Sequence, residues 1–204
     1  MSRPLVPHAV ALALALSLPA VACDHKDLTG SAAIAPEPSG AITPAKLVDQ
    51  DGRAFGPVEL GSHVWIAAIM LTSCTMMCPV MAQRMAYLQT LLPSHAASIR
   101  LLSITVDPEK DTPSVLFAYG QRFHRDPEAW TFVTGATAPI FASVNAGYKR
   151  APGTKGNFDH GDTLVLVGRD GHIEGYYGKD DSGVARIFAD ADRVALASAE
   201  SASR

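Results

Sequence analysis

The chain has 204 residues and a formal net charge of −3, with 18% of its residues charged. This length is enough for one folded domain with extensions. Positive charges are neither in excess nor clustered, so the composition argues against a nucleic-acid-binding protein.

The first 22 residues resemble an export signal. Arg3 provides the positive flank, and an apolar run over residues 9–18 leads to small residues that suit a cleavage point. This run is too short to span a bilayer. Cys23 follows the cleavage point, and Leu-Pro-Ala-Val-Ala-Cys resembles a bacterial lipobox. We therefore predict an exported bacterial protein that is held on the periplasmic side of a membrane by a lipid on Cys23. A secreted protein with a spare thiol is the alternative.

Residues 23–44 are rich in Ala, Pro, Ser and Gly, so they bury too little apolar surface to fold, and we predict a flexible tether. The folded domain is predicted over residues 45–198, with a disordered tail at 199–204. The domain opens with a β-hairpin over residues 47–53, because Asp51-Gly52 has the chemistry of a tight turn.

Strands and helices are then predicted to alternate along the domain. The strands are expected at 63–71, 100–106 and 130–134, the helices at 79–92, 113–124, 138–147 and 184–197, and a second hairpin at 163–167 and 172–176. The first strand is a nearly continuous apolar run, as expected for a central strand that is covered on both faces. Thr112 or Asp111 is expected to cap the helix that begins at Pro113.

This order predicts an α/β fold with a central mixed sheet flanked by helices. Cys74 and Cys78 lie at the first strand-to-helix junction, which is the layout of the thioredoxin-like fold. Helix N-termini offer unpaired amides and a positive dipole, so they lower the pKa of nearby thiols. The spacing lets both sulfurs reach one ion or, with modest adjustment, each other. The pair is therefore a disulfide, a dithiol or a metal site.

Methionines gather around these cysteines, at positions 70, 76, 77, 81 and 85. Thioether sulfur is a soft ligand of the kind that Cu(I) prefers. The spacing of Met81 and Met85 predicts core packing, whereas Met76 and Met77 lie between the cysteines and are candidates for contact with a metal or a partner. His160 is a candidate third ligand, although a single histidine is more often a surface or core residue. Two thiolates and one imidazole favour copper, since structural zinc sites take four ligands.

Three motifs together resemble the Sco/SenC family of copper-binding assembly factors. They are Cys74-x-x-x-Cys78-Pro79, the segment Val-Asp-Pro-Glu-Lys-Asp-Thr-Pro at 106–113, and Asp159-His160 before a strand-turn-strand. The resemblance implies that Cys74, Cys78 and His160 bind copper as Cu(I) or Cu(II). It further implies a metallochaperone that loads the binuclear copper site of cytochrome c oxidase. The implied partners are the copper-acceptor subunit of a respiratory oxidase or another periplasmic copper carrier, and we expect the protein to be a monomer.

Asp107 and Asp111 match the family's Asp-Pro loop and are expected to shape the rim of the site or a partner surface. The alternative function is that of an enzyme, a thiol-disulfide oxidoreductase that reduces the cysteines of the copper acceptor. One thiolate would attack the partner disulfide and the other would resolve the mixed disulfide, leaving a Cys74–Cys78 disulfide. In that case His160 would tune the thiolates instead of binding metal. Peroxide reduction by the same thiolates is a third interpretation.

Overall fold

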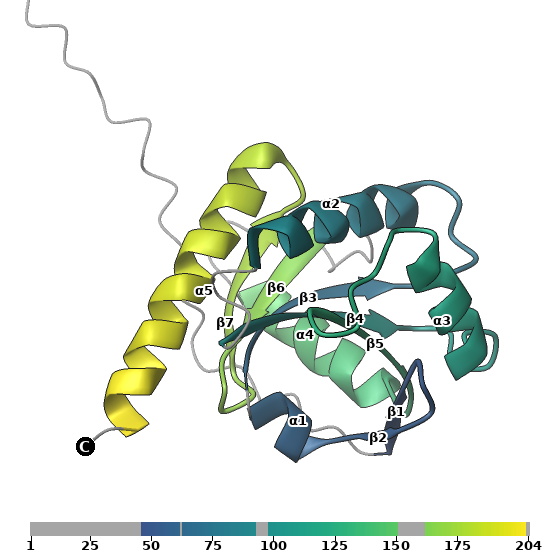
Figure 1. Cartoon of the computed structure of the whole chain (residues 1–204), viewed down its shortest axis with the longest axis horizontal. Helices are drawn as coiled ribbons and strands as arrows, with labels where there is room; N and C mark the ends of the chain where they lie inside the picture. The colour runs from purple at the N-terminus through teal and green to yellow at the C-terminus, as the bar shows by residue number, and fades with distance from the viewer. Residues whose placement is uncertain (1–45, 62, 93–97, 151–161, 203–204) are drawn as a thin grey trace, which may run out of the picture. The chain divides into compact units, whose positions relative to one another are not determined.

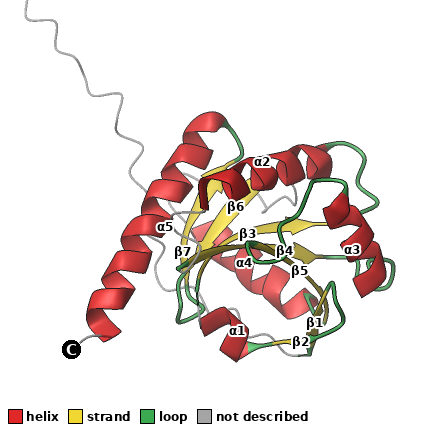
Figure 2. Cartoon of the chain, in the orientation of Figure 1, coloured by secondary structure: helices red, strands yellow, loops and turns green. Residues whose placement is uncertain are grey.

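The computed structural model describes residues 46–61, 63–92, 98–150 and 162–202 (Figure 1, Figure 2). Cys23, the predicted signal and the predicted tether lie outside these ranges. The strands are β1 Leu47–Asp49, β2 Ala54–Phe55, β3 Val64–Met70, β4 Ile99–Thr105, β5 Trp130–Gly135, β6 Thr163–Val167 and β7 Ile173–Gly178. The helices are α1 Pro57–Gly61, α2 Met77–Leu91, α3 Pro113–Gln121, α4 Ala138–Arg150 and α5 Asp181–Ala202. Among the described residues, no helix combines the length and apolarity needed to cross a bilayer.

The strands form one seven-stranded sheet in the order β2-β1-β5-β4-β3-β6-β7. β3, β4 and β5 are parallel, whereas β6 runs antiparallel to β3 and β7 runs antiparallel to β6. The predicted thioredoxin-like α/β fold with a central mixed sheet is therefore confirmed.

Helices cover both faces of the sheet (Figure 1). One face packs against α2, α3 and α5, and the other packs against α1 and α4. The side chains of β3 alternate between these two layers, so Ile66 and Ala68 enter one core while Trp65 and Ala67 enter the other. The prediction of a central strand buried on both faces is confirmed, since every residue of β3 is buried.

The predicted N-terminal hairpin is present, and Gly52 in its turn has φ 78°, a conformation that favours glycine. The position of this hairpin in the sheet was not predicted. β1 pairs antiparallel with β5. Gln50 secures the attachment, because its backbone N–H donates to Phe132 O (3.0 Å) and its Oε1 accepts from Phe132 N (2.7 Å). The hairpin therefore extends the central sheet.

Several helix ends differ from the predictions. α2 begins at Met77 instead of Pro79, so Pro79 is the third residue of the helix. Proline is tolerated there because the N–H groups of a first helical turn have no partner within the helix. α3 ends at Gln121 instead of His124, where the chain turns with φ 53° at His124. Its expected cap is wrong in detail, because Thr112 occupies the N-cap position without a side-chain capping bond.

The last helix is longer than predicted at both ends. α5 begins at Asp181 instead of Val184, and Asp180 Oδ1 accepts a hydrogen bond from Gly183 N (2.8 Å), which caps the first turn. The helix continues to Ala202, into the segment predicted as a tail. α1 was not predicted, because five residues with one buried side chain, Leu60, carry almost no periodic signal.

Candidate metal centre

The cysteine loop lies at the carboxyl ends of the parallel strands. β3 ends at Met70 and β4 at Thr105, and Val106 N donates to Met70 O (2.9 Å), so the two strand ends are joined. Open α/β sheets place ligand sites at this edge, because the strand-to-helix loops gather there. The cysteine loop and the Asp-Pro loop at 107–113 are therefore neighbours.

Cys74 lies just outside the N-terminus of α2 and is partly exposed. The N-cap residue, Met76, has no side chain able to cap the helix. The sulfur of Cys74 takes this role, since it accepts a hydrogen bond from Cys78 N (3.4 Å). That amide, with those of Met76 and Met77 and the Cys78 thiol, lowers the pKa of Cys74 below its usual value, and burial opposes the shift. The thiolate is thus favoured at Cys74.

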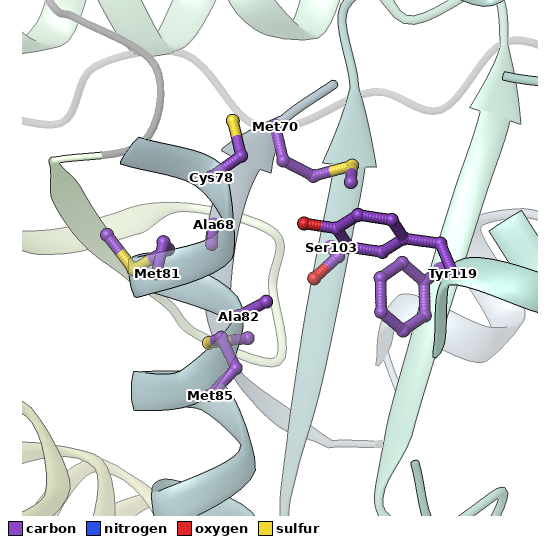
Figure 3. A pocket seen from close by; sticks show the side chains of 9 residues that line it. Ala68, Met70, Cys78, Met81, Ala82, Met85, Ser103 and Tyr119 are labelled. Carbon is purple, nitrogen blue, oxygen red and sulfur yellow. The ribbon is translucent and has the colours of Figure 1, made fainter. Parts of the chain in front are cut away.

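Cys78 is the second residue of α2 and is buried, with 1% of its surface exposed. It lies at the start of the helix that carries Met81, Ala82 and Met85 into the core (Figure 3). Burial, with a smaller contribution from the neighbouring Cys74 sulfur, raises the pKa of the Cys78 thiol to about 11. The two cysteines therefore differ strongly, although the sequence had suggested one shared environment.

This asymmetry predicts unequal reactivity. At pH 8, Cys74 is expected to react with iodoacetamide at least about tenfold faster than Cys78, because the thiolate is the reacting form and Cys78 is almost fully protonated. Quenched reactions followed by peptide mass spectrometry measure both rates. In urea-unfolded protein the two rates should converge, and equal rates in the folded protein would contradict the prediction.

Asp111 holds the cysteine loop in place from within the protein. It is fully buried (0% exposed). Its carboxyl group accepts hydrogen bonds from Thr72 N (3.1 Å), Thr72 Oγ1 and Thr105 Oγ1. A role on a partner surface is therefore wrong for Asp111, whereas shaping the site agrees with these contacts. Thr72 and Thr105 were not among the predicted site residues, because a polar residue at or just after the end of an apolar strand is a weak signal.

The other predicted residues of the site lie nearer the surface. Asp107 is half-buried and forms an ion pair with Lys110 (3.0 Å). Met76 is 76% exposed and Met77 is half-buried, so Met76 is open to a metal or a partner. Met81 and Met85 are buried, which confirms their predicted packing role.

His160 lies outside the residues that the structure describes. Within the described ranges, no group of three or more His, Cys, Asp or Glu residues could hold a metal ion. The described part of the candidate centre is therefore the cysteine pair, with its two thiols as soft donors.

Comparisons with known proteins agree with the fold described above. A model of the SCO1/SenC family matches residues 36–195. A SCO1/SenC family lipoprotein from Bacillus anthracis has a similar structure, with 27% identity, a TM-score of 0.61 and coverage of 78% of this chain and 98% of that one. BsSco, a member of the Sco family of cytochrome c oxidase assembly proteins in which a disulfide switch was identified, is 26% identical in sequence. Its structure matches with a TM-score of 0.64, and the match covers 79% of this chain and 97% of BsSco. ScoI of Bradyrhizobium japonicum with copper bound is 25% identical in sequence. Its structure matches with a TM-score of 0.56, and the match covers 78% of this chain and 99% of ScoI.

Proposed function

Because the chain belongs to the SCO1/SenC family, we propose that it is a copper metallochaperone. It binds one copper ion through Cys74, Cys78 and His160, and it delivers copper to the binuclear site of cytochrome c oxidase. The copper-bound structure of ScoI and the assembly role named for the family of BsSco support this proposal. The protein acts as a monomer, with the copper-acceptor subunit of the oxidase or another periplasmic copper carrier as its partner.

One observation carries the ligand set. In the pairing of β3 with β6, Ala68 lies opposite Leu164. The same register brings Asp162 level with Met70, at the end of β3 where the cysteine loop begins. Asp162 is the described residue nearest in sequence to the proposed ligand His160, so its position at this edge supports the proposal. The topology thus supports a site built from segments that are far apart in the sequence.

The chemistry of the cysteines suits a transferable ion. Cu(I) prefers soft donors, and it binds thiolates, so binding at neutral pH must release protons, chiefly from Cys78. Cys74 is partly exposed, which allows an acceptor to approach the ion from that side. Oxidation of the pair to a disulfide would remove both thiolates and thus abolish the site.

The proposal also includes the cellular location of the protein. The protein is exported and is anchored by lipid at Cys23 on the periplasmic side of the membrane. The sequence before Cys23 and the lipoprotein from Bacillus anthracis support this placement.

Copper titration of the reduced protein under anaerobic conditions tests the function. Wild type should bind about one equivalent of Cu(I), and His160→Asn should weaken binding by about tenfold or more, because the amide oxygen is a hard donor. The control is His124→Asn, which makes the same change at an exposed histidine. If wild type binds no copper, or if both variants bind like wild type, the proposal fails.

The difference between the two thiols favours a second function, thiol-disulfide oxidoreductase activity. A partly exposed Cys74 with a lowered pKa suits the attacking thiolate, and the buried Cys78 suits the resolving thiol. Reduction of a disulfide-bonded acceptor peptide by the His160→Asn variant separates the two functions. Rapid reduction with unchanged copper affinity would favour the oxidoreductase.

A further inference from the structure

A small cavity lies beside Cys78. It measures about 10 Å³ and is lined by residues of α2, β3, β4, β5 and α3, including Cys78, Ser103 and Tyr119. That volume is about the minimum that one water molecule needs. Apolar cavities of this kind stay empty, so the polar groups in the wall decide whether water is present.

The hydroxyl group of Tyr119 is the polar group without a partner. Tyr119 is 3% exposed, and among the described residues its Oη forms no hydrogen bond. Figure 3 shows the ring extending from α3 toward α2, with its oxygen directed into the cavity. Buried hydroxyl groups without a partner are rare in folded proteins, because desolvation without a hydrogen bond is unfavourable. This hydroxyl therefore calls for a ligand inside the cavity.

Ser103 supplies a second hydrogen-bonding group. It is buried on β4, and its Oγ accepts a hydrogen bond from Trp130 Nε1 (3.0 Å). A hydroxyl group also carries one donor, and the Ser103 side chain lines the cavity next to Tyr119 (Figure 3). With Cys78 in the same wall, three polar side chains line a space the size of one water. Buried waters form about three hydrogen bonds.

We propose that one water molecule occupies this cavity, accepts hydrogen bonds from Tyr119 Oη and Ser103 Oγ, and donates one to the sulfur of Cys78. Tyr119 is then a positioning residue of the copper site, and this role rests on the proposed function. A hydrogen-bond donor behind the sulfur stabilises its negative charge when copper replaces the thiol proton. Such outer contacts orient and tune metal ligands, and their loss weakens binding by roughly 10–100-fold.

The test uses Tyr119→Phe, which keeps the ring and removes the hydroxyl group. Tyr87→Phe is the matched control, because it makes the same change at a tyrosine that is 52% exposed. Three measurements apply: a high-resolution crystal structure of the copper-free wild type, the affinity for Cu(I) by competition, and the sulfur-to-Cu(II) charge-transfer absorption. The charge-transfer absorption depends on the sulfur itself. If Tyr119 had a purely structural role, the wavelength of this absorption would therefore be the same in Tyr119→Phe as in wild type.

We expect density for one water within hydrogen-bonding distance of Tyr119 Oη. Tyr119→Phe should weaken Cu(I) binding by about tenfold and move the absorption to longer wavelength, since the sulfur loses a donor. Tyr87→Phe should match wild type in Cu(I) affinity and in the wavelength of the absorption. An empty cavity in the wild-type crystal overturns the inference even if Tyr119→Phe fails to fold, and so does an absorption band that does not move. If wild type binds no copper, the proposed function fails, and the positioning role fails with it.

Discussion

Replacing either Cys74 or Cys78 with alanine is expected to lower the affinity for Cu(I) by on the order of a hundredfold or more. Structural zinc sites with four ligands bind with roughly 10–16 kcal/mol, so one ligand contributes about 3 kcal/mol, which is more than a hundredfold in affinity. A site of three ligands has less redundancy than a site of four. Anaerobic competition with a Cu(I) chelator measures the change, and Thr75→Ala, an exposed position in the same loop, is the control.

Both cysteine variants should also be less stable than wild type without copper, for two different reasons. Cys74→Ala removes the sulfur that caps α2, and the loss of a helix cap costs about 1 kcal/mol. Cys78→Ala removes a buried sulfur and enlarges the cavity beside it, which also destabilises the fold. Urea unfolding of the copper-free variants separates these effects from ligand loss. A Cys74→Ala variant that binds copper within threefold of wild type would contradict the three-ligand site.

Local patterns in the sequence were enough for most of the fold. The apolar run before Cys74 predicts a strand buried on both faces, because parallel strands that lie between helix layers need no polar side. The Asp51-Gly52 turn predicts the first hairpin, since glycine adopts a positive φ readily. Each of these signals depends on neighbouring residues, which is why sequence alone reveals them.

Contacts between distant segments were beyond such reasoning. Nothing in residues 47–49 indicates that they pair with β5, because edge pairing depends on which strand the finished sheet leaves exposed. The separate environments of the two cysteines were missed because they depend on how deeply the first turn of α2 is buried. His160 became a ligand candidate mainly through the family resemblance, since spacing alone could not bring it to the cysteines.

The contacts of Asp111 with distant segments could not be predicted from the sequence either, and its replacement is the second prediction. It was grouped with Asp107 because both belong to one loop motif, yet Asp111 is fully buried and Asp107 is half-buried. Asp111→Ala removes the acceptor for three donors and leaves Thr72 N and two hydroxyl groups without their partner. Thr105 is fully buried and Thr72 is half-buried, and an unpaired buried group costs about 1–3 kcal/mol, so we expect a loss of about 3 kcal/mol in the free energy of unfolding.

The matched control for this variant is Asp107→Ala, a change in the same loop that breaks an exposed contact with Lys110 and should alter stability far less. Asp111→Asn should fall between the two, because one oxygen remains as an acceptor while the amide group faces donors. Urea unfolding of the copper-free proteins measures the order of stability of the three variants. The anchor also fixes the loop that carries Cys74, so Asp111→Ala, where it remains folded, should bind Cu(I) at least about tenfold more weakly. Equal unfolding midpoints for Asp111→Ala and Asp107→Ala would show that the buried carboxyl group does not hold the site together.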